Sequence, residues 1–263
     1  MSKLFDKKIV AITGAAGGIG QELCRHFGRE GATIFAIDKK DTVNTFAIEL
    51  AAEGITVHPL TCDISDAVAV TNSFCKLMKD FGDVDILVNN AGFSEHPTIE
   101  KTTPRDWAFD INGNLNGAYN CVHTVLPGMK KKGKAAIVTV GSVNGLSALG
   151  DPAYSAAKAA LISMTKAIAM ENGRYGIRAN IVLPGTVRTP IWNARAAKNP
   201  EVLKTLTRWY PLARIAEPSD IANAVAFLAS DAAGAITGVE LLVDCGLTAG
   251  NIVMSRELTL ENF

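Results

Sequence analysis

Short apolar, β-branched runs alternate with helical patterns along the whole chain, and this alternation constrains the fold more than any other feature. Parallel strands need long crossover connections, which helices usually supply. The pattern therefore predicts an α/β fold: a doubly wound parallel sheet of about seven strands with helices on both faces. The predicted strands are 8–13, 33–38, 56–61, 86–89, 135–141, 178–183 and 240–243, and the predicted helices lie near 18–30, 41–53, 65–81, 103–132, 151–173 and 218–229.

The domain organisation follows from length and continuity. The 263 residues contain no repeat and no low-complexity linker, so we expect a single domain over 1–263. One connection, at about 186–217, is unusually long and contains Trp192, Trp209 and Tyr210. Long connections are often functional, and disordered segments are poor in aromatic residues. We expect a partly helical flap over a site; the alternative is a packed surface excursion.

The composition argues against several classes of partner. Lys plus Arg and Asp plus Glu number 26 each, which predicts no nucleic-acid or membrane-surface partner. The five cysteines form no CxxC pair, and the four histidines show no metal-ligand spacing, so we expect free thiols and no metal site. No signal peptide or membrane-spanning run is visible. These observations predict a cytoplasmic protein.

A glycine-rich turn, TGAAGGIG over 13–20, follows the first predicted strand and leads into a helix. Glycines let the chain turn sharply and let a ligand approach the backbone. The unpaired N–H groups and partial positive charge of a helix N-terminus favour a phosphate. The turn therefore suggests a dinucleotide-binding site at the carboxyl edge of the sheet. Tight packing without a ligand is the alternative explanation.

Asp38 ends the second predicted strand, about 20 residues after the glycine turn, where a carboxylate can bind ribose hydroxyls. A carboxylate also repels the 2′-phosphate of NADP. No Arg or Lys lies inside the turn, although Lys39 and Lys40 follow Asp38 and would attract phosphate. We therefore predict NAD(H) rather than NADP(H). The alternative for Asp38 is an ordinary residue at a strand end.

Tyr154 and Lys158 stand four residues apart at the start of a predicted helix, so they share one helical face. An ammonium and an oxidised nicotinamide would both lower the phenol pKa, so that the phenol can exchange a proton with an alcohol or carbonyl. Ser142 ends the preceding strand at the same edge of the sheet. A YxxxK pattern alone is common, and a serine at a strand end is often only a cap.

Together these motifs resemble the short-chain dehydrogenase/reductase family, over nearly the whole chain up to about Gly246. The turn matches TGxxxGxG, residues 89–92 match NNAG, and residues 184–190 match PGxVxTP. Ser142, Tyr154 and Lys158 match the family's catalytic residues in type, order and spacing. The resemblance implies a single-domain Rossmann fold and a nicotinamide cofactor.

The resemblance also implies roles for individual residues. Tyr154 would be the general acid/base, Lys158 would lower its pKa and bind the nicotinamide ribose, and Ser142 would hold the substrate oxygen. Asn114 would support a water relay to the lysine, although Asn112 and Asn116 flank it. Asp63 would bind adenine, Asn89 would border the adenosine ribose, and Val187 and Thr189 would contact the carboxamide. The expected cofactor-binding set is Gly14, Gly18, Ile19, Gly20, Asp38, Asp63, Ile64, Asn89, Tyr154, Lys158, Val187 and Thr189.

The resulting functional prediction is an NAD-dependent alcohol dehydrogenase or carbonyl reductase that interconverts a secondary alcohol and a ketone. The sequence does not decide between a sugar, a polyol, a cyclic and a steroid-like substrate. The alternative is a non-catalytic NAD-binding sensor or scaffold; epimerases and dehydratases fit less well, because their glycine turns are spaced differently. Family members commonly form homotetramers. Residues 247–263 run past the family's usual end and would contact a neighbouring subunit, close the pocket or form a frayed tail.

Overall fold

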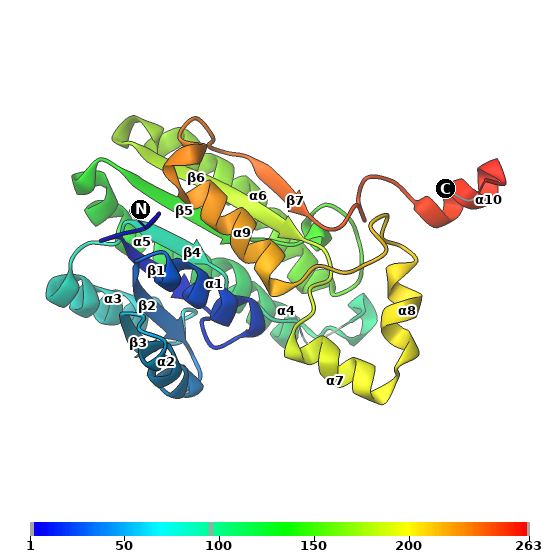
Figure 1. Ribbon diagram of the computed structural model, residues 1–263, viewed down its shortest axis with the longest axis horizontal. Helices are drawn as coiled ribbons and strands as arrows, with labels where there is room; N and C mark the ends of the chain where they lie inside the picture. The colour runs from blue at the N-terminus through cyan, green and yellow to red at the C-terminus, as the bar shows by residue number, and fades with distance from the viewer. Residues whose placement is uncertain (1–2, 95–96, 262–263) are drawn as a thin grey trace.

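The computed structural model describes residues 3–94 and 97–261, which form one seven-stranded parallel sheet (Figure 1). The strand order is β3-β2-β1-β4-β5-β6-β7, so the order reverses between β1 and β4. This confirms the predicted fold class, with strand ends within one or two residues of the prediction. The strands are β1 (Ile9–Thr13), β2 (Thr33–Asp38), β3 (Val57–Thr61), β4 (Ile86–Asn89), β5 (Ala135–Val140), β6 (Ile177–Pro184) and β7 (Glu240–Val243).

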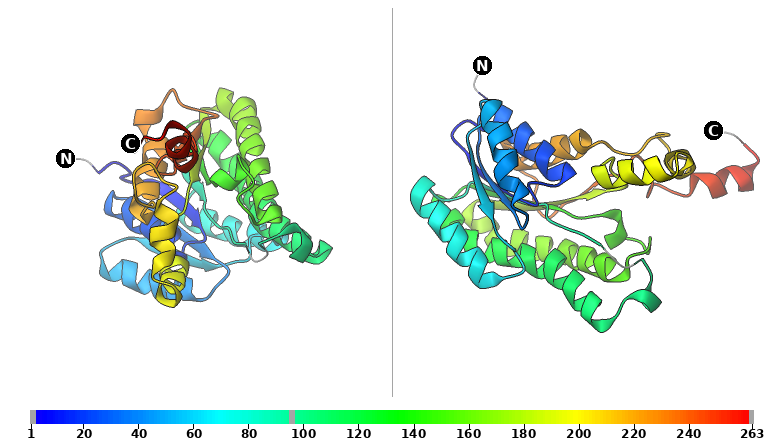
Figure 2. Two further views of the ribbon diagram at one scale, coloured as in Figure 1. Left: turned by 90° about the vertical axis from the view of Figure 1, so that its right-hand side faces the viewer. Right: turned by 90° about the horizontal axis from the view of Figure 1, so that it is seen from below.

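Helices cover both faces of the sheet (Figures 1 and 2). On one face α1, α2 and α9 pack in one apolar cluster; on the other, α3, α5 and α6 pack in a second. Successive strand residues alternate between the clusters: Val10 and Ile12 join the first, and Ala11 joins the second. The helices are α1 (Gly18–Arg29), α2 (Thr42–Ala52), α3 (Ala67–Phe81), α4 (Pro104–Ile111), α5 (Gly117–Lys132), α6 (Pro152–Asn172), α7 (Pro190–Lys198), α8 (Glu201–Thr207), α9 (Pro218–Ala229) and α10 (Ile252–Thr259).

The single helix predicted over 103–132 is interrupted. Thr103 begins α4 with a capping box to Asp106, but a π-helical turn, η2 (Asn112–Asn116), separates α4 from α5. The sequence of this turn, NGNLN, is rich in residues that favour helices weakly. Turns of this kind are frequent at functional sites, and this one contains Asn114.

The connection at 186–217 is partly helical, as expected, and contains α7 and α8. Its two ends are joined at its base. Val187 pairs with Ala216 in a parallel bridge, and Arg188 forms a 2.8 Å ion pair with Glu217. The Tyr210 hydroxyl donates to Thr186 Oγ1 at 2.8 Å and accepts the Thr186 N–H at 3.1 Å. These contacts hold the two ends of the connection to each other just after β6, while α7 and α8 extend beyond them (Figure 1).

The C-terminal segment forms a helix, α10, that projects away from the rest of the chain (Figures 1 and 2). Its side chains Leu258 and Leu260 are 71% and 90% exposed. Among the described residues, α10 lines neither of the two hollows described below. Phe263, which the prediction also included, lies outside the described residues.

Substitution of Gly20 tests how tightly the glycine turn packs. A Cβ on this residue would collide with the carbonyl oxygen of Gly14 and come within 2.9 Å of Ala15 Cα. We expect Gly20→Ala to lower the free energy of unfolding by about 3 kcal/mol, because the backbone of the turn must move. Urea denaturation of Gly20→Ala against Gly250→Ala measures this effect. Gly250 has no atom within 4 Å of its Cβ position, so its variant should unfold like the wild type. Equal stability of the two variants would contradict the packing described.

Candidate active site

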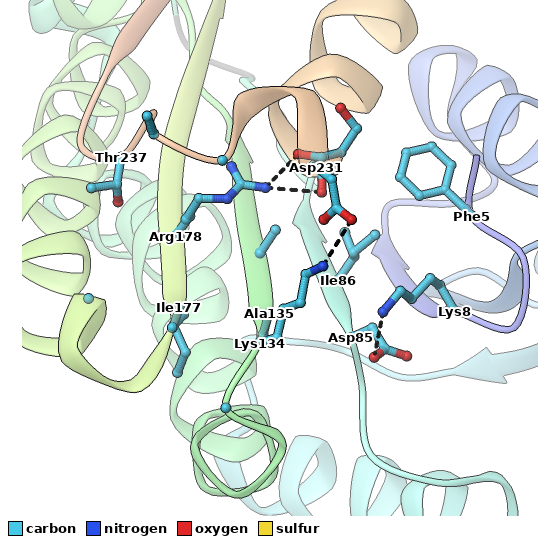
Figure 3. A pocket seen from close by; sticks show the side chains of 18 of the residues that line it. Phe5, Lys8, Asp85, Ile86, Lys134, Ala135, Ile177, Arg178, Asp231 and Thr237 are labelled. Carbon is cyan, nitrogen blue, oxygen red and sulfur yellow. Dashed lines mark hydrogen bonds and ion pairs between the residues drawn. The ribbon is translucent and has the colours of Figure 1, made fainter.

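Two hollows differ in position and chemistry. The larger, about 530 Å³, lies at the amino edge of the sheet (Figure 3). Its charged groups are already paired: Lys8 lies 3.7 Å from Asp85, and Lys134 lies 2.9 Å from Asp231. Arg178 donates to the carbonyls of Leu228, Ala229 and Ser230 at the end of α9. These contacts hold the ends of neighbouring strands and helices together. Once they are accounted for, the main feature of the hollow is its size.

The smaller hollow, about 150 Å³, lies at the carboxyl edge beside the point where the strand order reverses. Crevices at this position are where open parallel sheets bind ligands. It brings together residues from the start of α1, the ends of β4, β5 and β6, and the start of α6. They are Ile19, Asn90, Gly92, Val140, Gly141, Ser142, Tyr154, Lys158, Pro184, Gly185 and Val187. The residues that line this cleft therefore favour it, rather than the larger hollow, as the candidate active site.

Tyr154, Lys158 and Ser142 meet in this cleft. Lys158 Nζ lies 5.3 Å from the centre of the Tyr154 ring and donates to the carbonyl of Val140 at 2.9 Å. The lysine is only 2% exposed. An ammonium has three donors, so the bond to Val140 orients the group and leaves further donors for hydroxyls in the cleft. Helical spacing on α6 and the end of β5 place these groups together.

Burial dominates the titration of these groups. It lowers the pKa of Lys158 from 10.5 to about 8. It raises the pKa of Tyr154, opposed by a hydrogen bond with Ser142 and reinforced by the nearby carboxylate of Asp151. We expected a lowered tyrosine pKa. In the chain alone the direction is opposite, because the cost of burying a phenolate exceeds the stabilisation from Ser142.

Asn114 and Gly92 lie behind the reactive side chains. Asn114 is 1% exposed and binds the main chain of Phe93 at two points, accepting its N–H at 3.1 Å and donating to its carbonyl at 2.9 Å. A Cβ on Gly92 would lie 3.0 Å from Asn114 Oδ1 and 3.2 Å from Lys158 Nζ. Asn114 thus fixes the segment that passes beside the lysine; of the three neighbouring asparagines, it is the buried one.

The glycine turn is held to β4 and to Asp38. Thr13 Oγ1 accepts the N–H groups of Asn90 and Ala91. Gly14 has φ of +66°, and a Cβ there would lie 2.8 Å from Ala91 Cα. Asp38 Oδ2 accepts the N–H of Ala16 at 3.0 Å, which places the carboxylate beside the turn. A Cβ on Gly18 would lie 2.8 Å from Pro190 Cδ, so the turn also touches the start of the flap.

The helix N-terminus beside this turn is open to a ligand. Gly17 is the N-cap of α1 and provides no side-chain hydrogen bond to the first turn. The first N–H groups of the helix therefore depend on a partner outside the helix. Tight packing accounts for the glycines at 14, 18 and 20, while the uncapped N-terminus is what an anion would bind.

The remaining predicted cofactor residues lie along the same edge. Asp63 is exposed, and its carboxylate binds Ser65. Ile64 is buried, and its carbonyl accepts the side chain of Asn120. Thr189 is the N-cap of α7 and touches Gly18. These three stay predictions as cofactor contacts.

Asn89 and Asn90 have different surroundings, and the role of Asn89 beside the adenosine ribose stays a prediction. Asn89 is 4% exposed, and its side-chain amide has no hydrogen-bond partner among the described residues. Asn90 lines the cleft and donates to the carbonyls of Thr13 and Gly14. The prediction overlooked Asn90 and Gly92 as cleft residues. The signal was available, since both belong to the NNAG motif.

Two further features concern residues 3–94 and 97–261. Within these ranges, no helix has the length and apolar character needed to cross a membrane. In the same ranges, no three His, Cys, Asp or Glu side chains lie close enough to hold a metal.

Comparisons with known proteins agree with this geometry. A family model described as enoyl-(acyl carrier protein) reductase matches residues 14–248. The chain is 41% identical to uncharacterized oxidoreductase C922.06 of Schizosaccharomyces pombe, over 97% of this chain and 96% of that protein. It is 36% identical to the 2,3-dihydro-2,3-dihydroxybenzoate dehydrogenase of Bacillus subtilis, over 95% and 99%.

A crystal structure of a short-chain dehydrogenase/reductase-family oxidoreductase from Burkholderia thailandensis is similar throughout. Its sequence identity is 48%, the TM-score is 0.91, and the match covers 98% of this chain and 99% of that one. The fold, the cleft and these relatives lead to one conclusion. The chain belongs to the short-chain dehydrogenase/reductase family of oxidoreductases, which use nicotinamide cofactors.

Proposed function

We propose that this protein is an NAD(H)-dependent dehydrogenase that interconverts a secondary alcohol and a ketone. One observation carries the proposal: the Tyr154 phenol lies beside the buried ammonium of Lys158, in a cleft that also holds the Ser142 hydroxyl. A phenol, a cation and a hydroxyl suit proton exchange with a substrate oxygen. They provide no nucleophile activated by a neighbouring base, as acyl transfer would need.

The residues fit a nicotinamide dinucleotide at this edge. The uncapped N-terminus of α1 would hold the pyrophosphate, Asp38 would bind the adenosine ribose, and Lys158 would donate to the hydroxyls of the nicotinamide ribose. When bound, the nicotinamide would supply or accept the hydride. Its positive charge in the oxidised form would also lower the pKa of Tyr154, against the effect of burial.

Each reactive side chain then has a task in the proton transfer. Ser142 donates a hydrogen bond to the substrate oxygen and fixes its position. Tyr154 takes the hydroxyl proton during oxidation and returns it during reduction. The Lys158 ammonium stabilises the phenolate form of Tyr154. Asn114 holds the Phe93 segment beside Lys158, and we assign it a part in passing the proton onward through water.

Cofactor choice is the first test of the site. Asp38 is expected to favour NAD over NADP, because its carboxylate would face the 2′-phosphate of NADP. We expect the wild type to show at least about tenfold higher kcat/KM with NAD, and Asp38→Asn to reduce that ratio to near one. Initial rates with both cofactors measure it.

Asp41→Asn provides the matched control. Asp41 is exposed at the start of α2, three residues from Asp38, and its side chain does not cap that helix. Removing its charge should leave the cofactor ratio unchanged. A wild type that prefers NADP, or equal shifts in both variants, would overturn the assignment of Asp38.

The substrate side of the cleft is proposed to include the flap at 186–217, with Trp192 on α7 as an apolar wall. Rates of NAD reduction with glucose, sorbitol, cyclohexanol and androsterone compare a sugar, a polyol, a cyclic alcohol and a steroid. The proposal requires turnover with a secondary alcohol. Binding of NADH without turnover of any alcohol or the matching ketones would favour the second candidate, an NAD-binding sensor or scaffold.

We also propose a cytoplasmic homotetramer. Exposed apolar side chains on edge strand β7 and on α9, Leu242 and Phe227, support association, because an uncovered strand edge tends to pair. On α6, Ala157 is buried in the core, whereas Ala159 is exposed. Sedimentation velocity showing a monomer would refute the assembly.

A further inference from the structure

The Ser142 hydroxyl is held by its near neighbour Asn144. Ser142 Oγ donates to Asn144 Oδ1 at 3.3 Å and accepts the N–H of Asn144 at 3.2 Å. A serine hydroxyl has one proton and rotates freely unless a neighbour fixes it. In the structure that proton is donated to Asn144 Oδ1, and in the proposed reaction it turns to the substrate oxygen. The contacts that hold Ser142 Oγ in place therefore affect catalysis.

The amide of Asn144 is itself anchored to the start of α6. Its Nδ2 donates to Ser155 Oγ at 3.3 Å and to the carbonyl of Gly150 at 3.4 Å. Ser155 Oγ donates to the same Gly150 carbonyl at 2.7 Å. One side chain therefore connects the end of β5, which carries Ser142, to the first turn of α6, which carries Tyr154.

The segment that Asn144 and Ser155 hold is conformationally strained. Asp151, the N-cap of α6, has φ of 50° and ψ of 67°, a left-handed conformation that is unfavourable for a residue other than glycine. Gly150 has φ of +92°. Strained backbone persists only where surrounding contacts hold it, and it is common at active sites. The two hydrogen bonds to the Gly150 carbonyl supply part of that hold.

We propose that Asn144 is a positioning residue of the dehydrogenase reaction: its amide fixes the Ser142 hydroxyl relative to the helix start that carries Tyr154. Ser155 supports it from the other side of the bridge. This inference rests on the proposed function, but it concerns residues that the cofactor and the substrate need not touch. If Asn144 only capped the loop, its loss would affect the stability of the protein alone.

The test compares Asn144→Ala, Ser155→Ala and the double variant, using NAD and the panel alcohol with the highest kcat/KM. We expect Asn144→Ala to lower kcat about tenfold with KM changed less than about twofold, because a positioning bond is lost while substrate contacts remain. The double variant should be little worse than Asn144→Ala, since both residues act through one bridge. Additive losses in kcat would contradict the proposal.

A titration without substrate distinguishes positioning from stability. The phenolate absorbance of Tyr154 is obtained as the difference between each protein and its Tyr154→Phe counterpart. Since the bond with Ser142 lowers the pKa of Tyr154, a misplaced hydroxyl should move the titration to higher pH. Asn172→Ala is the control: it removes a buried amide bond to Ile168 at the far end of α6, so it should lower stability and leave kcat and the titration unchanged.

The possible outcomes distinguish failure of the proposed function from failure of the proposed role of Asn144. If the wild type turns over no alcohol, the proposed function fails, and the titration alone tests the role of Asn144. If the wild type is active and Tyr154→Phe is not, but Asn144→Ala keeps the wild-type kcat and titration, the positioning role is wrong and the proposed function stands.

Discussion

Tyr154→Phe is expected to lower kcat by about 10³-fold, within the range that general acid–base groups contribute, while NADH binds with nearly unchanged affinity. The phenol hydroxyl is the group that would exchange the proton, and phenylalanine keeps the ring that lies over Lys158. Stopped-flow single turnovers measure the chemical step, and fluorescence titration measures NADH affinity.

Tyr175→Phe is the matched control for this result. Tyr175 lies just before β6 at the opposite edge of the sheet, and its hydroxyl accepts a hydrogen bond from Arg174. Its loss should leave kcat unchanged. A Tyr154→Phe variant within about threefold of the wild-type kcat would remove the phenol from the mechanism, because general acid–base groups contribute far more than that.

Lys158→Met is expected to lower kcat/KM by about 10²-fold or more, because the variant loses both the cation beside Tyr154 and the donors to the nicotinamide ribose. Methionine is close to lysine in length and apolar, so it fills the buried position without a charge. NADH affinity should fall together with turnover, in contrast to Tyr154→Phe. Unchanged NADH affinity would contradict the role of Lys158 in binding the cofactor.

The same variant has a pH signature in stability. Lys158 has a pKa of about 8 when folded and 10.5 as a free side chain, so between these values the unfolded chain binds more protons. Wild-type stability should therefore rise relative to Lys158→Met as pH increases from about 8 to about 10.5. The integrated gain is roughly 3 kcal/mol. Denaturation midpoints of both proteins at several pH values measure the difference; parallel curves would show that the folded lysine is not perturbed.

Most of the fold could be predicted from local sequence, because doubly covered parallel strands read as short apolar runs and their crossovers have helical periodicity. The strands β2, β4 and β7 and the helix α9 coincide with their predicted ranges. The π-helical turn at Asn112–Asn116 could not be predicted, because its hydrogen bonding depends on tertiary contacts such as the bonds between Asn114 and Phe93. Likewise, nothing in residues 247–263 indicated that α10 would stand apart from the chain.

The residues of the candidate site could be predicted where they belong to recognisable sequence motifs. Ser142, Tyr154 and Lys158 share a cleft because the end of β5 and the start of α6 meet at one sheet edge. The spacing of these residues along the sequence could not predict the surroundings of their side chains in the fold. The direction of the Tyr154 pKa depends on how deeply the fold buries the ring, and the Asn144 bridge depends on the conformation of the 150–151 turn.

A crystal structure of the protein with NAD tests the central claim most directly, namely that Tyr154 and Lys158 form a proton-exchanging pair beside the dinucleotide. The account predicts the nicotinamide ribose within hydrogen-bonding distance, about 2.6–3.2 Å, of both Tyr154 Oη and Lys158 Nζ. It also predicts the pyrophosphate at the N-terminus of α1. A nicotinamide ring far from Tyr154, or NAD seated in the hollow at the amino edge instead, would contradict it.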